Sequence, residues 1–301
     1  MKNTRNFRQA DLLLRLLPYV REEEFALKGG TAINYFYREL PRLSIDIDLT
    51  FLPLLDRETS LERISKALHR ISERIKKWPG TRLNLKKSKQ GFVGLTVEKN
   101  GMSIKIEPNL VFRGTVFPPG EKNLVKTASQ LFETEISFMC LSPADLYGSK
   151  ICAALDRQHP RDLFDIKLLL ENEGLTNEVR QAFIIFLISH PRPMVELLNP
   201  NLQDLSLDFF SEFRGMTIFR VSLDELIHVR KKLVTMLKAG LTPEERRFIL
   251  SVKSGKHEWN LCAIKHARNL PAVQWKLRNI SQMEHRKHKR AREKLQKFLE
   301  L

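Results

Sequence analysis

Apolar residues repeat with two different periods in the first half of the chain. A period of two predicts a strand at 45–51, and further strand-like runs lie at 25–28 (a short apolar run), 92–98, 103–110 and within 133–141. Helical spacing predicts helices at 9–20 (ending near Pro18), 31–40 and 61–78. Asn100-Gly101 joins two of the strand-like runs and favours a tight hairpin. Strands and helices are therefore expected to mix over this half.

From Ser142 onward the pattern is almost wholly helical. Ser142-Pro143 supplies an N-cap hydroxyl followed by proline at the first helical position. A second helix begins near Pro160 and Gly174 closes it. The tail from Ser281 is a basic helical segment. We expect an α+β fold in two domains, 1–170 with mixed strands and helices and 171–301 mostly helical with a basic terminal tail.

The chain is strongly basic, with 51 Lys and Arg against 35 Asp and Glu and a net charge of +16. This balance favours a polyanionic partner, although a solvated surface would produce it as well. The three cysteines form no CxxC pair, which argues against a disulfide framework or a zinc site. No apolar run approaches the roughly 18–20 residues that span a bilayer. We expect a cytoplasmic protein with no membrane partner.

A glycine turn marks the end of the first strand. Gly29-Gly30 lets backbone amides approach a phosphate, and a helix starting at Thr31 would direct its N-terminal dipole toward the same anion. The Thr31 hydroxyl can add a hydrogen bond. An ordinary strand-to-helix turn with an N-cap has the same sequence, so the turn alone leaves both interpretations open.

Two carboxylates follow the turn on a predicted strand. Asp46 and Asp48 are two residues apart, so both point to one face, about 7 Å apart along the backbone. Mg²⁺ favours one or two carboxylates together with substrate phosphates. Glu107 shares a strand face with Lys105 and would complete a metal triad or act as a base if its strand lies beside that of Asp46. Solvent-facing acids would give the same pattern without function.

The segments LKGGTAINYFYRELPRLSIDIDLTF, SIKIEPN and LYGSKICAALDRQHPRDLFDIKLL, with the closing stretch RFILSVKSGKHEWNLCAIKHARNLPAVQWKLRNI, resemble the AbiEii/AbiGii toxin family of nucleotidyltransferases. The resemblance implies a DNA-polymerase-β-like nucleotidyltransferase domain followed by a helical C-terminal half. It also implies a bacterial toxin of an abortive-infection, phage-defence or toxin–antitoxin system, with an antitoxin as partner. Its expected substrates are a nucleoside triphosphate (NTP) and RNA, above all tRNA.

The resemblance assigns roles by position. The phosphate-contacting turn of the family is matched by Gly29, Gly30 and Thr31, although serine is commoner than threonine at the last position. The family's Arg-x-Ser element is matched by Arg42 and Ser44, which we expect to bind the nucleotide. Asp46 and Asp48 match the metal-binding carboxylates, which implies Mg²⁺ as cofactor. The remaining catalytic candidates are Lys150 for the triphosphate, the acids Asp162 and Asp165, and Glu107.

The residues themselves support part of this assignment. The point charge of Lys150, about two turns into a helix, suits a phosphate, although a helical lysine is usually just solvated. Asp162 and Asp165 share a face of a first helical turn, where acids stabilise a helix without catalysis. Arg157 and Arg161 are placed to pair with these acids or to contact phosphate.

The sequence favours a Mg²⁺-dependent nucleotidyltransferase toxin acting on RNA, with tRNA as the expected acceptor. One alternative keeps the fold but uses a small-molecule or protein hydroxyl as acceptor. Another is a non-catalytic, basic RNA-binding protein on the same scaffold. The seven Lys and Arg residues after Ser281 suit contact with an RNA backbone or a solvated terminal helix.

Overall fold

The computed structural model of the chain describes residues 4–89 and 91–301. They divide into two compact units. The first comprises residues 1–146 and 215–219, and the second comprises 147–214 and 220–301. Residue 170, where the sequence analysis placed the domain boundary, lies near the end of helix α6, Pro160–Asn172. No helix among the described residues combines the length and apolar character needed to cross a membrane.

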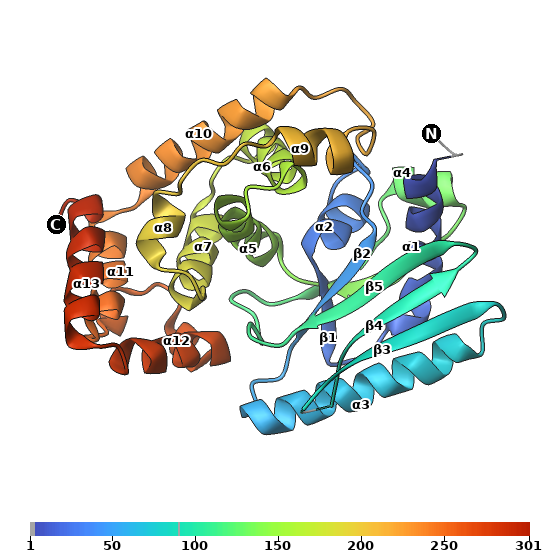
Figure 1. The fold of residues 1–301 in the computed structure, drawn as a ribbon, viewed down its shortest axis with the longest axis horizontal. Helices are drawn as coiled ribbons and strands as arrows, with labels where there is room; N and C mark the ends of the chain where they lie inside the picture. Colours follow the sequence, from blue (N-terminus) through green and yellow to red (C-terminus); the bar gives the residue numbers. More distant parts are fainter. Residues whose placement is uncertain (1–3, 90) are drawn as a thin grey trace. The chain divides into compact units, whose positions relative to one another are not determined.

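The first unit is built on a seven-stranded mixed sheet in the order β3-β4-β5-β2-β1-β7-β6 (Figure 1). Its elements are α1 (Arg5–Val20), β1 (Phe25–Lys28), α2 (Gly29–Ala32), a π-helical turn (Ile33–Tyr37), β2 (Asp46–Phe51), α3 (Arg57–Lys76), β3 (Thr81–Ser88), β4 (Gly91–Lys99), β5 (Met102–Asn109), β6 (Gly120–Asn123), α4 (Lys126–Phe132) and β7 (Ser137–Cys140).

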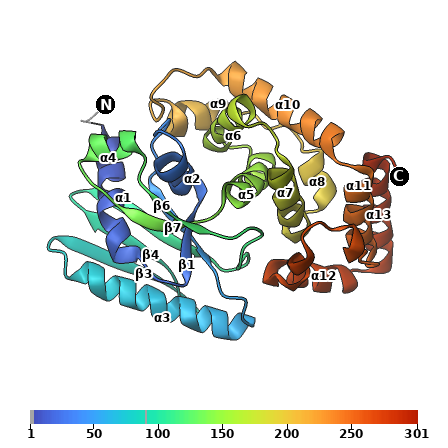
Figure 2. The same cartoon turned by 180° about the vertical axis from the view of Figure 1, so that it is seen from behind.

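Alternation along the central strands sets the two faces of this sheet. Ile47 and Leu49 of β2 are fully buried, as is Ile106 of the neighbouring strand β5. They form a core with α1 and α3, which pack on that side of the sheet (Figure 2). Asp46 and Asp48 point to the opposite face because successive side chains alternate across a strand. The predicted strand at 45–51 is confirmed, and so is the consequence that both carboxylates share one face.

The hairpin prediction is also confirmed. β4 and β5 pair antiparallel from Lys99 and Met102 inward. Asn100 and Gly101 connect them with φ of 50° and 72°, respectively. Two consecutive residues of positive φ match the right-handed twist of the strands, which is why Asn-Gly is favoured there.

Three local predictions needed adjustment. Helix α1 continues through Pro18 to Val20. The predicted helix at 31–40 is shorter, consisting of α2 and the π-helical turn, which ends at Tyr37. β3 was not predicted as a strand: its run TRLNLKKS has only two apolar positions, Leu83 and Leu85, and both are only half-buried.

The described residues of the second unit form helices and loops only, which confirms the helical pattern. Its elements are α5 (Pro143–Asp156, whose first turn belongs to the first unit), α6 (Pro160–Asn172), α7 (Asn177–Ser189), α8 (Met194–Leu198), α9 (Ser206–Asp208), a π-helical turn (Phe209–Phe213), α10 (Leu223–Gly240), α11 (Pro243–Ser254), two 3₁₀ turns (Trp259–Leu261 and Lys265–Asn269), α12 (Pro271–Ser281) and α13 (His285–Leu299).

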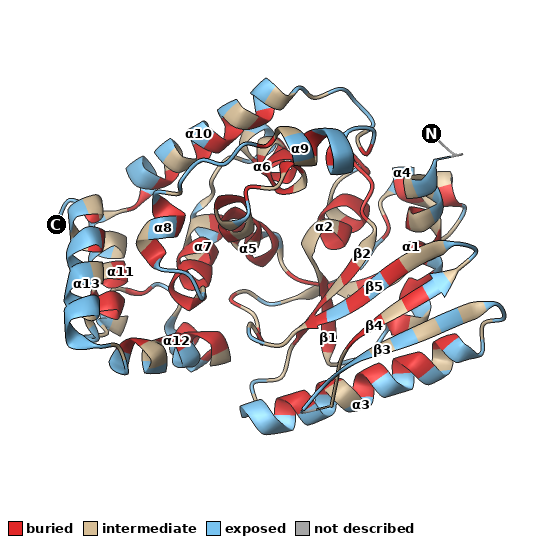
Figure 3. Cartoon of the chain, viewed as in Figure 1, coloured by how far each residue is buried: buried red, intermediate tan, exposed pale blue. Residues whose placement is uncertain are grey.

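Capping residues fix the starts of these helices as the sequence indicated. The Ser142 hydroxyl accepts a hydrogen bond from the backbone N–H of Asp145 at 3.1 Å, at the start of α5. Gly174, with φ of 71°, follows the end of α6. The basic tail forms α13, which buries Leu295 and Leu299 and leaves much of its surface exposed (Figure 3).

Candidate functional site

The glycine turn lies directly against the two-aspartate strand in the first unit. β1 and β2 run antiparallel, and their register pairs Lys28 with Asp48. The chain leaves β1 through Gly29, which has φ of 72°. A Cβ on Gly29 would lie 2.5 Å from Asp48 Oδ2, closer than real contacts allow. The Asp48 carboxylate therefore occupies space that any larger residue at position 29 would fill.

Gly30 makes a second close approach. A Cβ there would lie 2.5 Å from a terminal nitrogen of Arg42 and 3.0 Å from Ser44 Oγ. Arg42 is 3% exposed, and its other terminal nitrogen donates to the Leu43 carbonyl at 2.9 Å. Arg42 and Ser44 thus support the turn from beneath, consistent with their sequence-based grouping with the glycines.

Thr31 connects the turn to β2. Its hydroxyl, almost fully buried, lies 2.5 Å from the Asp46 carbonyl oxygen, to which it donates, and 3.0 Å from Ser44 Oγ. The phosphate-contacting role predicted for Thr31 remains a prediction, because these contacts are internal to the protein. What they do here is fix the backbone that carries the Asp46 side chain.

Tyr35 is a supporting residue that the sequence analysis missed. Its hydroxyl donates to the Ser44 carbonyl at 2.9 Å and accepts from the Ser44 N–H at 3.1 Å. Complete burial raises the pKa of this phenol well above its ordinary value, so it stays a neutral donor and acceptor. Its helical spacing after the glycine turn was the available signal, but the spacing does not specify the partner.

Glu107 is brought beside the aspartates by a parallel pairing. β2 and β5 are neighbours, with Asp46 opposite Lys105 and Asp48 opposite Glu107. Paired residues on adjacent strands point to the same face about 5 Å apart. The strand adjacency that a role for Glu107 required is therefore present. Its carboxylate also lies 3.9 Å from Lys86 Nζ of β3.

Asp46 and Asp48 suit a hard divalent cation in chemistry, since both offer carboxylate oxygens on one partly exposed face. The close fit of Gly29 against Asp48 leaves the turn's backbone near the same oxygens. Within residues 4–89 and 91–301, no three His, Cys, Asp or Glu side chains are grouped closely enough to form a metal site by themselves. A cation here would thus depend on substrate oxygens to complete its shell.

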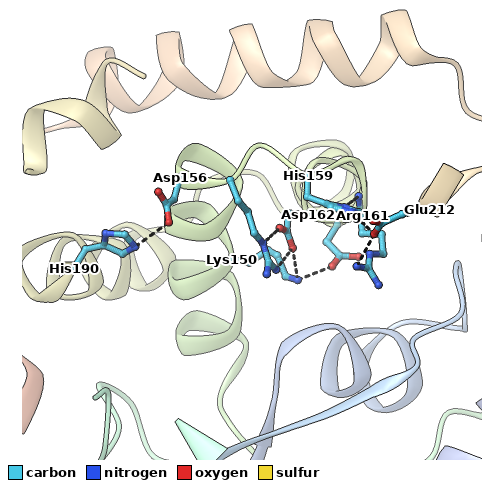
Figure 4. A network of polar contacts seen from close by, with 9 residues as sticks. Lys150, Asp156, His159, Arg161, Asp162, His190 and Glu212 are labelled. Carbon is cyan, nitrogen blue, oxygen red and sulfur yellow. Dashed lines mark hydrogen bonds and ion pairs between the residues drawn. The ribbon is translucent and has the colours of Figure 1, made fainter. Parts of the chain in front are cut away.

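The remaining predicted residues form a separate cluster in the second unit (Figure 4). Lys150 of α5 places its ammonium 3.0 Å from a carboxylate oxygen of Asp162 and 3.0 Å from one of Asp165, both on α6. All three residues are at most 6% exposed. Lys150 is thus held between two buried carboxylates.

Arg157 completes the charge balance of this cluster. Its guanidinium contacts both oxygens of Asp162, at 2.5 and 3.0 Å, in the bidentate geometry that suits arginine. Burial alone would raise the pKa of Asp162, but Lys150 and Arg157 outweigh it and hold that pKa well below its ordinary value. The predicted pairing of Arg157 with one of these acids, Asp162, is confirmed, and Arg161 contacts Glu212 at 3.4 Å.

Comparisons with known proteins return a family and a similar structure. Residues 11–279 match the family model described as "Nucleotidyl transferase AbiEii toxin, Type IV TA system". The chain is similar in structure to MenT4, a nucleotidyltransferase toxin from Mycobacterium tuberculosis H37Rv, with a TM-score of 0.58, 15% identity and 92% of each chain covered. That likeness extends to the fold. A search of curated proteins returns no match.

Proposed function

The chain belongs to the AbiEii family of nucleotidyltransferase toxins of type IV toxin–antitoxin systems, and from this premise we propose that it transfers a nucleotide from an NTP to a hydroxyl of RNA, with tRNA as the expected acceptor. The observation that carries the proposal is the contact between the glycine turn and the carboxylate strand, where Gly29 has room for Asp48 only because it lacks a Cβ. This arrangement brings amides suited to phosphate and carboxylates suited to a cation to one place.

The candidate residues of the first unit have different roles in this proposal. The backbone of Gly29 and Gly30 receives the triphosphate. Asp46 and Asp48 would hold Mg²⁺, which supplies Lewis-acid polarisation of a phosphoryl oxygen when bound. Thr31 fixes the Asp46 backbone through its hydrogen bond. Glu107, beside Asp48, is placed to accept the proton of the attacking hydroxyl.

The second unit contributes the proposed charge partner of the triphosphate. Lys150 is the residue expected to neutralise the phosphates that leave, with Asp162 and Asp165 holding its ammonium in place. Arg157, whose side chain is 63% exposed, offers a second cation, bound to Asp162. The net charge of +16 supports a polyanionic acceptor such as RNA. These substrates also place the reaction in the cytoplasm, with a cognate antitoxin as partner.

Labelling of total RNA with each of the four α-labelled NTPs tests the proposal. We expect Asp48→Ala to reduce incorporation by at least about 10²- to 10³-fold, the range for removing one group that stabilises developing charge. The same variant should relieve toxicity when expressed. Glu98→Gln is a control, because Glu98 is an exposed acid on strand β4 of the same sheet, separated from β2 by β5.

The outcome also separates the acceptor classes. Label in RNA with wild type, absent with Asp48→Ala, supports the proposal. Label in protein or in small molecules alone would replace the RNA acceptor by one of the alternatives. Toxicity that survives Asp48→Ala would contradict the mechanism.

A further inference from the structure

Helix α3 and the start of β4 border an open surface pocket of about 470 Å³ in the first unit. It is lined by Ser65, Lys66, His69 and Arg70 of α3 and by Phe92 of β4. β3 is an edge strand of the sheet and is largely exposed (Figure 3). The sequence from 81 to 90 carries four basic residues and no acidic one. Lysines commonly protect an edge strand from pairing, so charge alone calls for no ligand.

The backbone of β4 at Gly91 and Phe92 is held close to helix α3 at one side of the pocket. Ser65 Oγ accepts a hydrogen bond from the Phe92 N–H at 2.9 Å. Gly91, with φ of 111°, brings β4 so close to α3 that a Cβ there would lie 2.5 Å from Ser65 Oγ. The start of β4 is thus held against the helix, and Phe92 is positioned before any ligand arrives.

Two aromatic rings face this pocket in nearly parallel planes. The rings of His69 and Phe92 have centroids 6.3 Å apart and planes only 10° apart. His69 is exposed and Phe92 is half-buried. Any planar base that stacks on one of these rings is therefore parallel to the other as well. Aromatic faces beside basic side chains are the combination that single-stranded nucleic acids use.

The basic side chains around the two rings differ in how strongly they are paired with carboxylates. Lys87 Nζ lies 5.5 Å from the centroid of Phe92, and no described carboxylate forms an ion pair with it. Lys66 pairs with Glu62 one helical turn away, but both side chains are about two-thirds exposed and such pairs are weak. Arg70 is bound to the buried carboxylate of Glu22 and belongs to the wall. Lys87 and Lys66 are the cations available to a phosphate.

The pocket is distinct from the carboxylate site. α3 packs on the sheet face that buries Ile47 and Leu95, whereas Asp46 and Asp48 point to the other face. A ligand in the pocket is therefore not at the reacting atoms. It would be a part of the substrate away from the reactive end.

We propose that this pocket is an RNA-binding exosite that takes an unpaired nucleotide of the acceptor, with the base stacked on His69 and Phe92 and its phosphate on Lys87 and Lys66. The proposal rests on the proposed function, since it assigns a second contact to the same RNA. Such a pocket would recognise unpaired bases, in addition to the electrostatic attraction between the basic chain and the RNA backbone.

Fluorescence anisotropy with a labelled single-stranded oligoadenylate and the full chain tests the exosite. We expect His69→Ala to weaken binding by about 5- to 100-fold, the range that loss of one base–aromatic contact produces. His228→Ala is the matched control, because His228 is an exposed histidine on α10. His69→Phe should restore binding, since it keeps a stacking face.

Further variants separate stacking from charge. Phe92→Leu keeps an apolar side chain at the start of β4 but removes the aromatic ring, so it should weaken binding nearly as much as Phe92→Ala. The thermal unfolding midpoint of Phe92→Ala shows whether that variant is still folded. Lys87→Ala should lower the slope of log affinity against log salt by about 0.7, the value for one single-strand phosphate contact, and Lys76→Ala on α3 should affect it less.

The two proposals fail differently. Wild-type binding that His69→Ala and Phe92→Leu leave unchanged overturns the exosite, even if RNA labelling by the wild type succeeds. Absence of oligoadenylate binding to the wild type overturns it too. Loss of RNA labelling by the wild type with stacking-dependent binding intact overturns the transfer reaction and leaves the exosite standing. With both intact, His69→Ala should raise KM for RNA and leave kcat unchanged.

Discussion

The two clusters of candidate residues handle charge in opposite ways. In the first unit, Asp46 and Asp48 are partly exposed, and the glycine turn beside them has no side chain of its own. In the second unit, Lys150, Asp162 and Asp165 are buried and bound to one another. The first cluster leaves its carboxylates accessible to a ligand, whereas the second is largely balanced within the protein. The two clusters therefore differ in that the first presents partly exposed carboxylates, whereas the second holds its cation in a fixed position between buried acids.

Burial makes the second cluster costly to disturb. An ion pair taken out of water is stable only while both partners remain, and removal of one leaves an uncompensated charge. The partly exposed carboxylates of β2 carry a smaller penalty, because water reaches them. Substitutions should thus separate the clusters: those in the first unit should reduce activity with little loss of stability, whereas those in the second should reduce stability as well.

The largest expected effect on stability belongs to Lys150→Met. It removes the buried cation that contacts both Asp162 and Asp165, and we expect a loss of about 3–5 kcal/mol in the free energy of unfolding. Lys76→Met is the control, since Lys76 makes an i,i+3 pair with Glu73 in which both side chains are about half exposed, and it should lose under about 1 kcal/mol. Denaturant unfolding of both variants measures the difference. Equal losses would show that the buried cluster is not the structural element described here.

Gly29→Ala should reduce stability less than Lys150→Met does, and Gly101→Ala is its control. Both glycines have φ of 72°, so both variants incur the same left-handed backbone strain of about 1–2 kcal/mol. A Cβ at Gly29 would also meet Asp48 Oδ2, whereas a Cβ at Gly101 would meet nothing within 4 Å. We expect only Gly29→Ala to lose nucleotide transfer. Equal activity in the two variants would contradict the role given to the close approach.

The smallest effect is a pH dependence of stability from Asp162. Its pKa is lowered in the folded state from an ordinary value near 3.8, so the folded protein binds fewer protons there than the unfolded chain. This stabilisation is present above pH 4 and is lost as pH falls further, by at most about 1.4 kcal/mol per pH unit. Unfolding of wild type and Asp162→Asn at pH 3 to 7 measures it. The variant should be less stable at neutral pH, and the gap should narrow below pH 4; a constant gap would contradict the assignment.

The sequence predicted those features that short-range physics determines. The two-residue period of β2 determined the shared face of Asp46 and Asp48, and Asn100-Gly101 determined a hairpin. β3 was missed because an edge strand buries little and its run shows only two apolar positions. Helix α1 passes Pro18 because proline sits near its end, where few following residues depend on the ladder that it interrupts.

The sequence indicated the candidate residues but not the contacts that they make. Register between β2 and β5 brings Glu107 to Asp48, and no local pattern specifies which strands become neighbours. Tyr35 and its hydrogen bonds to Ser44 depend on the turn between them, which sequence spacing does not define. The pairing of Lys150 with Asp162 and Asp165 likewise needs α5 and α6 to pack side by side. What the sequence could not predict is therefore the tertiary pairing of these candidate residues.

The return of residues 215–219 to the first unit bears on how the protein is made. This segment forms a β-bridge from Thr217 to Arg42, and Met216 accepts a hydrogen bond from the Leu43 N–H at 2.9 Å. Domains fold as units during synthesis, from the N-terminus onward. The unit that carries the glycine turn cannot be completed until residue 219 has been synthesised, long after its sheet. During most of its translation, the nascent chain therefore lacks the segment that holds the backbone of Arg42 and Leu43. A chain truncated before residue 215 would lack it permanently.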